Sequence, residues 1–191
     1  LIDPVAVADV RIPSASIGYR LQVERAVADN FGLDGSPARL AAKLHAESAW
    51  RGNAQSPYAN GIAQFTPATA KWLPTVCPDV GLPDPWDADW SIRAAACYDS
   101  WLHDRVRGAT ECDRWAKTQA AYNGGLSWIE RDERLAASNG VDPLVWFGGV
   151  ELHTARAAWA RKENRAYPRK ILLVLEPAYI AAGWSGTAVC R

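Results

Sequence analysis

A single carboxylic acid on an apolar helical face is the feature that most constrains this chain. Ser36 followed by Pro37 is typical of a helix N-cap and first helical residue, and a glycine follows the last turn. On a helix with about 3.6 residues per turn, Leu44 and Glu47 project to the same side. The pattern therefore predicts a helix over 37–51 whose one acid points inward among leucines.

Burial among apolar side chains disfavours the ionised form of a carboxyl, so we expect the pKa of Glu47 to rise toward neutrality. A carboxyl tuned in this way can transfer a proton near physiological pH. A Glu that pairs with an arginine at the edge of the core is an equally good explanation of the helix alone. No other Asp or Glu occurs from Ser48 through Pro78, so a second carboxylate must come from a distant segment.

Four short blocks follow one another along the chain. The first surrounds Glu47 and continues through a loop rich in Gly, Asn and Gln, and the second opens a later helix. The third is the Ala-Tyr-Asn-Gly-Gly run at 121–125, and the fourth is Glu163-Asn-Arg-Ala-Tyr167. The first two consist of Glu47, Ser48, Ala54, Ser56, Gly61, Ile62, Gln64, Pro67, Thr69 and Ala70, and of Asp87, Ile92, Arg93, Ala94 and Tyr98.

In this order, over roughly residues 36 to 175, the blocks resemble the catalytic domain of soluble lytic transglycosylases, lysozyme-like enzymes that cut bacterial peptidoglycan. Each block alone is weak evidence, whereas four in the family's order are strong. The resemblance implies a mainly α-helical, lysozyme-like domain with a small loop or β region beside the catalytic helix. We expect residues 1–191 to form one catalytic domain of this kind.

The resemblance also implies roles for individual residues. Glu47 is implied to be the only catalytic residue, acting first as acid and then as base. The family uses no metal and no cofactor, and its partner is the glycan strand of peptidoglycan. The other matched side chains are implied to bind substrate, and they are Ser48, Ser56, Gln64, Tyr122, Asn123 and Glu163.

Three of these positions also have structural explanations that need no resemblance. Tyr122 and Asn123 precede two glycines, which are typical of a helix end. Gln64 is equally typical of an amide that satisfies backbone groups of its own loop. The family motif favours the substrate-binding role for all three.

Two departures from the family pattern affect the site. The loop that begins at Ser56 is one residue shorter than in the family, which leaves the direction of this serine open. Asp99 stands where the family has an apolar residue, on the inner face of a helix expected over 91–107. A buried acid needs a partner, so we expect an ion pair with Arg93 or Arg105. The alternative is that Asp99 supplies a second carboxylate near the cleft.

The implied reaction follows from having one acid. Ordinary glycosidases use two carboxylates, so here the substrate must supply the missing group. The resemblance implies that Glu47 protonates the oxygen between N-acetylmuramic acid and N-acetylglucosamine and then removes the proton of the muramoyl C6 hydroxyl. That hydroxyl closes on C1 and gives a 1,6-anhydro end without consuming water. The alternatives are a goose-type lysozyme-like muramidase that hydrolyses the same bond and a non-catalytic glycan-binding module.

Residues typical of helix ends, Ser and Pro at the start and Gly after the last turn, divide the sequence into segments that predict an almost entirely helical chain. The proline-rich region 74–90 is expected to be a loop that flanks the cleft. The expected helices run from Ser14 or Ser16 to Gly32, then over 37–51, 67–73, 91–107, 113–123, 126–138, 143–163 with a break near Gly148, and 167–182 with a kink at Pro177.

The net charge of zero, from 21 basic and 21 acidic residues, argues against a nucleic-acid binder that depends on phosphate attraction. A local excess of six basic over two acidic residues at 151–170 favours a solvated helix face over affinity for anionic wall polymers. The apolar run 171–175 is too short to span a bilayer, and no N-terminal signal segment is visible. We expect a monomer that acts on the cell wall outside the cytoplasm, and a compact domain of this kind favours a bacteriophage lysis protein.

Cysteine and tryptophan usage agrees with that setting. Four cysteines form an even set that could make two disulfides in an oxidising compartment, with three pairings open and four reduced thiols as the alternative. Ten Trp against three Phe suits a glycan cleft, because flat rings stack on sugars. Trp101 and Trp115 are expected in the core, whereas the candidates for substrate contact are Trp50, Trp86, Trp90 and Trp128.

Overall fold

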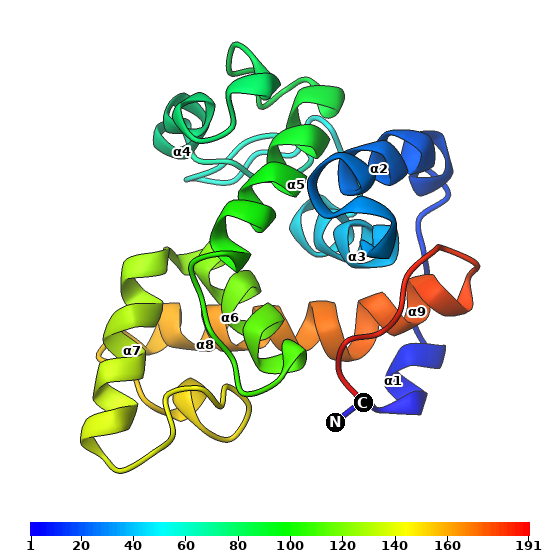
Figure 1. Cartoon of the computed structure of the whole chain (residues 1–191). Coiled ribbons are helices and arrows are strands. Elements are labelled where there is room, and N and C mark those ends of the chain that lie inside the picture. The colour runs from blue at the N-terminus through cyan, green and yellow to red at the C-terminus, as the bar shows by residue number, and fades with distance from the viewer.

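The computed structural model describes residues 1–191 and consists of helices and the loops between them (Figure 1). The β-type pairing is limited to two single bridges, which join Gln55 to Asn60 and Asn60 to Phe65. The prediction of a mainly α-helical chain is confirmed. The α-helices are α1 (Pro4–Ala8), α2 (Ser16–Phe31), α3 (Pro37–Ser48), α4 (Pro67–Trp72), α5 (Ala88–His103), α6 (Glu111–Gly124), α7 (Leu126–Ser138), α8 (Ala158–Arg169) and α9 (Glu176–Ala181).

Short helical turns fill several of the connections. Four of them are 3-10 turns, and the fifth is a stretch of wider π-helix between α8 and α9. They are η1 (Gly32–Asp34), η2 (Leu73–Thr75), η3 (Pro78–Val80), η4 (Val150–Leu152) and η5 (Lys170–Leu175).

Helix α5 runs through the middle of the molecule and packs against both α2 and α6 (Figure 1). On one side of it, α3 packs against η5 and α9, and on the other α6 packs against α7 and α8. One continuous cluster of buried apolar side chains joins these helices, with Leu44, Ile92 and Ile171 fully buried. No helix is both long enough and apolar enough to cross a bilayer.

Local sequence explains where the helices begin. The side chains of Ser36, Thr66 and Asp87 each accept a hydrogen bond from a backbone N–H in the first turn of α3, α4 and α5. Helix α6 begins with a capping box, in which Thr110 and Asp113 satisfy each other's backbone N–H groups. Because Asp87 provides the cap, α5 begins earlier than the helix predicted over 91–107.

The prediction of a helix over 143–163 is wrong for residues 143–157. Residues 139–157 form turns and the short η4, and the helix α8 starts at Ala158. Buried carboxylates hold this segment: Asp113 accepts a hydrogen bond from the N–H of Trp146 at 2.8 Å, and Glu151 accepts one from the N–H of Gly148 at 2.7 Å. Hydrogen bonds of this kind leave no periodic pattern in the sequence, so hydrophobic periodicity alone predicts a helix for the segment.

Helices α8 and α9 form one long rod with η5 between them, which crosses the lower half of the molecule in Figure 1. Pro168 near the end of α8 and Pro177 at the start of α9 each lack the N–H that a regular helix needs. The wider turn of η5 lies between these two prolines. The rod therefore continues through Pro177, where the sequence predicts a kink.

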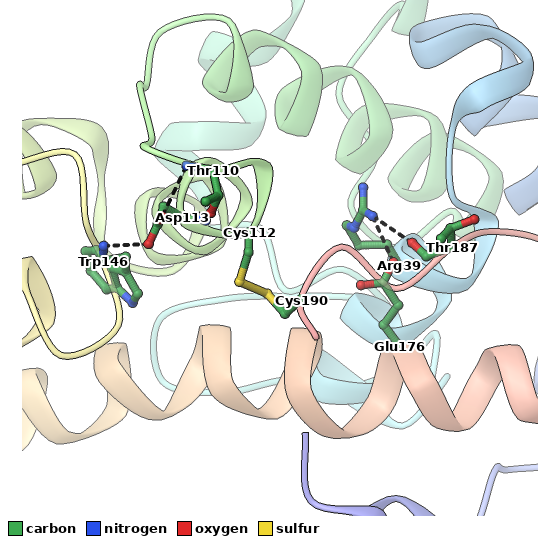
Figure 2. Close-up of a disulfide and its surroundings, with 8 residues drawn as sticks. All are labelled: Arg39, Thr110, Cys112, Asp113, Trp146, Glu176, Thr187 and Cys190. Atoms are coloured by element: carbon green, nitrogen blue, oxygen red, sulfur yellow. Dashed lines mark hydrogen bonds and ion pairs between the residues drawn. A yellow bond between two sulfur atoms is a disulfide. The ribbon is translucent and has the colours of Figure 1, made fainter. Parts of the chain in front are cut away.

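Two disulfides close the fold, so the prediction of an even, paired set of cysteines is confirmed. Cys77 pairs with Cys97, and Cys112 at the start of α6 pairs with Cys190 near the C-terminus. Figure 2 shows the second bond beside an ion pair between Arg39 of α3 and Glu176 of α9, whose atoms lie 2.9 Å apart. The C-terminal segment is thereby held against helices that are far away in sequence.

Candidate active site

A cleft of about 630 Å³ opens above the last turn of α3. Its lining comes from the end of α3, the loop over residues 56–66, Thr69 of α4, Tyr98 of α5, the end of α6, Arg156 and one side of α8. The cleft also contains a single residue of η5, Lys170. Residues that the sequence separates by more than a hundred positions thus face one space.

Glu47 lies on the floor of this cleft with one edge open to it. The hydroxyl of Tyr167, from α8, donates a hydrogen bond to Glu47 Oε1 at 2.5 Å. Burial raises the pKa of Glu47 to about 7, and the hydrogen bond from Tyr167 and the charge of Lys43 oppose that rise. A carboxyl in this state exchanges a proton readily near neutral pH.

Two tyrosines on the cleft wall stay protonated at any physiological pH. Burial and the nearby charge of Glu47 raise the pKa values of Tyr122 and Tyr167 well above their usual range. Tyr122 uses its hydroxyl to donate to the carbonyl of Ala63 at 3.0 Å, which ties the end of α6 to the loop over residues 56–66, called the site loop below. Tyr167 instead turns its proton toward the carboxyl on the cleft floor.

Behind the floor, Lys43 Nζ and Asp99 Oδ1 form an ion pair at 2.8 Å, with both side chains buried. The ammonium also lies 3.2 Å from the centre of the Tyr122 ring, a cation–π contact. The expected arginine partner of Asp99 is wrong, because Arg93 binds Asp89 and Arg105 lies over the ring of Trp101. Asp99 is not among the residues that line the cleft.

Most of the residues that the family resemblance singles out come together here. Ser56, Gln64, Tyr122, Asn123 and Glu163 line the same cleft as the acid. Ser48 does not line it: its buried hydroxyl donates to the carbonyl of Ile62 at 2.7 Å and ties α3 to the site loop from behind.

Backbone geometry fixes the site loop. Gln64 has a left-handed backbone conformation, with φ of 52°, and its side-chain Nε2 donates to the carbonyls of Ala54 at 3.1 Å and Gly61 at 2.8 Å. A Cβ on Gly61 would collide with the carbonyl of Pro85, so this glycine lets the 74–90 region pack behind the loop. The amide of Gln64 therefore stabilises its own loop as well as lining the cleft.

The polar wall at the other end belongs to α6 and α8. Asn123 Nδ2 lies 3.5 Å from Glu163 Oε1, and Asn123 Oδ1 accepts a hydrogen bond from Asn164 at 3.0 Å. The buried Asn164 also donates to the carbonyl of Ala120 at 2.8 Å. Asn123 and Glu163 are thus positioned as a pair by the packing of α8 on α6.

The prediction of substrate contact is wrong for two of the four tryptophan candidates, because Trp50 and Trp90 are core residues, 2% and 3% exposed. Trp86 and Trp128 lie outside the cleft lining, and their contact with substrate stays a prediction. The tryptophan that does line the cleft is Trp159, which is 70% exposed. Its spacing of four residues from Glu163 on one helical face is the pattern that could have identified it.

Two further cleft residues were assigned no role from sequence. Tyr167 belongs to the fourth block and lies one turn after Glu163, so helical spacing could have placed it on the same face. Arg156 precedes α8 and belongs to none of the four blocks. No sequence pattern pointed to it.

The structure defines the protein as a mainly α-helical domain with an acid on the floor of its cleft, and comparison with known proteins gives the family. The model of the transglycosylase SLT domain matches residues 32–143, more than half of the chain. The chain therefore belongs to the transglycosylase SLT domain family.

Individual relatives agree with this family. Membrane-bound lytic murein transglycosylase F of Marinobacter nauticus is 34% identical over 134 residues, which is 68% of this chain and 25% of that protein. The protein of the same name from Shewanella frigidimarina is 36% identical over 110 residues, 56% of this chain and 22% of the relative. The chain thus spans about a quarter of the length of the curated relatives that it matches.

The fold agrees with a solved structure. The 70 kDa soluble lytic transglycosylase of Escherichia coli superimposes with a TM-score of 0.67 over 95% of this chain and 27% of that enzyme, at 21% identity. At this identity the likeness concerns the fold. The expected lysozyme-like architecture is confirmed.

Proposed function

We propose that the protein is a peptidoglycan lytic transglycosylase, which cleaves the bond between N-acetylmuramic acid and N-acetylglucosamine and leaves 1,6-anhydro ends. The observation that carries this proposal is Glu47, a carboxyl on the cleft floor with a pKa of about 7 and a tyrosine hydroxyl on one oxygen. A pKa near the working pH lets one group serve first as acid and then as base. Family membership and the murein transglycosylase names of the relatives support the same reaction.

The reaction runs in two proton transfers through Glu47. The protonated carboxyl first gives its proton to the glycosidic oxygen as the bond from C1 to that oxygen breaks. Tyr167 stabilises the carboxylate that results, because its hydroxyl already donates to Oε1. The carboxylate then accepts the proton of the muramoyl C6 hydroxyl while O6 bonds to C1. The acid is restored, and no water is consumed.

Asp99 has no part in this chemistry. The hydrolytic alternative needs a group that directs water at C1, and Asp99 was the candidate from sequence. Its carboxylate is buried against Lys43 at 2.8 Å and does not line the cleft, which supports a structural role. The goose-type muramidase therefore has no support from this residue.

The cleft lining supports substrate-binding roles for most matched residues. We assign Ser56, Gln64, Tyr122, Asn123 and Glu163 to contacts with the sugars on either side of the cut bond. Ser48 is assigned to the support of the loop, because its hydroxyl is already occupied by backbone carbonyls.

The proposed setting is the cell wall outside the cytoplasm, with peptidoglycan strands as partner. Two disulfides support an oxidising compartment, since such bonds persist there. One continuous core from α2 to the C-terminal segment supports residues 1–191 acting as a single catalytic domain, and we propose that it acts as a monomer. An origin in a bacteriophage stays a prediction.

Mass spectrometry of muropeptides after digestion of purified peptidoglycan tests the reaction. We expect 1,6-anhydro ends from the parent protein and near-complete loss of product from Glu47→Gln, whose amide fills the same space without shuttling a proton. Ends that are heavier by one water would identify a muramidase instead. Undiminished product from Glu47→Gln would overturn the role of this carboxyl.

A further inference from the structure

Arg156 is a cation on the cleft wall whose guanidinium has no hydrogen-bond or ion-pair partner in the protein. It lies just before α8 and lines the cleft together with Trp159 and Glu163. Its one hydrogen bond comes from its backbone N–H, which donates to Thr154 Oγ1 at 3.2 Å. The guanidinium makes no hydrogen bond or ion pair. Its Nη1 is fully enclosed against Gly124, so Nε and Nη2 are the two nitrogens that can reach a ligand in the cleft. An arginine in such surroundings normally satisfies its donors with carboxylates or carbonyls.

The surrounding packing holds this guanidinium in place. Its Cζ lies 5.2 Å from the centre of the Trp128 ring, within the range of a cation–π contact. A Cβ on Gly124 would collide with Nη1, so the glycine at the end of α6 makes room for the arginine. The side chain is therefore fixed at the cleft wall before any ligand arrives, which reduces the entropy lost on binding.

The acidic groups around Arg156 do not neutralise it. Asp132 is buried and uses its Oδ2 in an ion pair with Arg165 at 2.7 Å, while its Oδ1 has no hydrogen-bond partner. Its charge attracts Arg156 without forming an ion pair, and Arg165 repels the guanidinium. Glu163 attracts it from the cleft side without forming a contact. Burial lowers the pKa of Arg156, and the attraction of the two carboxylates only partly opposes this. A bound anion would supply the missing counter-charge.

We propose that Arg156 binds a carboxylate of the substrate and so makes the cleft selective for glycans that carry one. This inference rests on the proposed function, because peptidoglycan carries its carboxylates on muramoyl residues, either on the attached peptide or on the lactyl group where no peptide is attached. N-acetylglucosamine residues carry none. The planar fork of an arginine suits a carboxylate, which accepts two parallel hydrogen bonds. Arg156 thus distinguishes muramoyl strands from neutral, chitin-type glycans.

Calorimetric binding in a Glu47→Gln background tests the proposal without cleavage. The ligands are a muropeptide tetrasaccharide with free carboxylates, the same fragment with its carboxylates amidated, and neutral N-acetylglucosamine tetrasaccharide. Arg156→Gln should raise the Kd of the free-acid fragment about tenfold, as expected for one charge-assisted contact, and leave that of the neutral glycan within about twofold. Arg131→Gln is the matched control, because Arg131 lies 5.0 Å from the same Trp128 ring but does not line the cleft. It should change neither Kd.

The amidated fragment keeps the proposal testable even if Arg156→Gln fails to fold. It should bind the Glu47→Gln protein about tenfold more weakly than the free acid, a comparison that does not use the Arg156 variant. Where Arg156→Gln does fold, it should cause no further loss of affinity for the amidated fragment. Equal Kd values for the free-acid and amidated fragments would overturn the proposal, as would equal weakening of anionic and neutral ligands by Arg156→Gln. Failure of the parent protein to release anhydro ends would instead refute the proposed function, whatever these Kd values are.

Discussion

At the scale of single residues, the pKa of Glu47 links catalysis to the stability of the fold. Burial raises this pKa to about 7 from an ordinary value of 4.5, so the folded protein holds a proton that the unfolded chain releases. The contribution of this raised pKa to the free energy of unfolding is fully present below pH 4.5 and is lost as pH rises through about 7. The ionised acid therefore destabilises the fold in the range where it must act as a base.

Glu47→Gln should accordingly stabilise the protein at pH 8, because the neutral amide avoids the cost of a buried charge. We expect a gain of up to about 3 kcal/mol in the free energy of unfolding at pH 8 and little change at pH 4. Urea denaturation at the two pH values measures it. Glu130→Gln, on the exposed surface of α7, is the control and should change little at either pH. Equal effects of Glu47→Gln at both pH values would contradict the raised pKa.

Tyr167→Phe should shift the pH dependence of activity upward. The hydrogen bond from Tyr167 lowers the pKa of Glu47, so its removal lets burial raise that pKa further. Since the first step needs the protonated acid, activity that falls above about pH 7 in the parent should fall at a higher pH in the variant. The maximal rate should also decrease. Tyr179→Phe, at a tyrosine that contacts His45 and Trp50 instead, should leave the midpoint unchanged.

Asp99→Asn should reduce stability without changing the product. Removing one charge of a buried pair leaves Lys43 unpaired, and we expect a loss of about 3 kcal/mol in the free energy of unfolding. The double change Lys43→Met and Asp99→Leu should recover most of that loss, because apolar groups replace both ions. Muropeptide analysis should still find 1,6-anhydro ends. Reducing ends made by the parent and abolished in Asp99→Asn would restore the water-directing hypothesis.

Sequence reasoning at this scale succeeded where helical spacing decides the outcome. Leu44 and Glu47 share a face three residues apart, so the inward acid and its raised pKa followed from one segment. The partner of Asp99 could not be found in this way, because Lys43 comes from a helix about fifty residues earlier. Arg156 escaped notice because its distinction is the lack of a partner, which only the folded structure reveals.

At the scale of elements, the end of α3 explains how Glu47 reaches the cleft. The helix ends at Ser48, and Ala49 and Trp50 take up left-handed conformations with φ of 50° and 67°. The predicted end near Gly52 was therefore a few residues late. A residue with a Cβ in this conformation is strained by about 1 kcal/mol or more. The chain turns at once into the core, where Trp50 is buried.

Ala49→Gly should relieve that strain. Ala49 is exposed, so the change removes no packing, and we expect a gain of about 0.5–1 kcal/mol in the free energy of unfolding. Ala28→Gly, at an exposed position inside α2, is the matched control and should cost about 1 kcal/mol. Thermal denaturation measures both changes: the melting temperature should rise in Ala49→Gly and fall in Ala28→Gly. A loss of stability in Ala49→Gly would show that the turn is held without strain.

Capped helices were predicted well and irregular segments poorly. The first turns of α3 and α4 each have a side-chain cap and a proline, both visible in the sequence. The short α1 was missed, although Asp3 caps it and Pro4 begins it. Residues 139–157 resisted prediction because buried contacts from other elements, such as Asp113 to Trp146, decide their course.

At the scale of the whole molecule, the cleft exists because the rod of α8, η5 and α9 lies across segments from the first half of the chain (Figure 1). The four sequence blocks resemble those of a known family, and this resemblance indicated which residues share the cleft. It could not give the distances between them, which depend on how α8 packs on α6 and η5 on α3. Tyr167 reaches Glu47 across 120 positions of sequence as a result.

The bond between Cys112 and Cys190 also determines how the molecule bears mechanical load. A pull on the two ends passes from residue 190 directly to residue 112, so the 78-residue loop between them, with α8 inside it, carries no tension. In single-molecule stretching, reduction of this bond should add about 270 Å of extensible length, from about 3.5 Å per residue. Under oxidising conditions that increment should be missing. The α8 wall of the cleft would then keep its shape while the rest of the chain is drawn out.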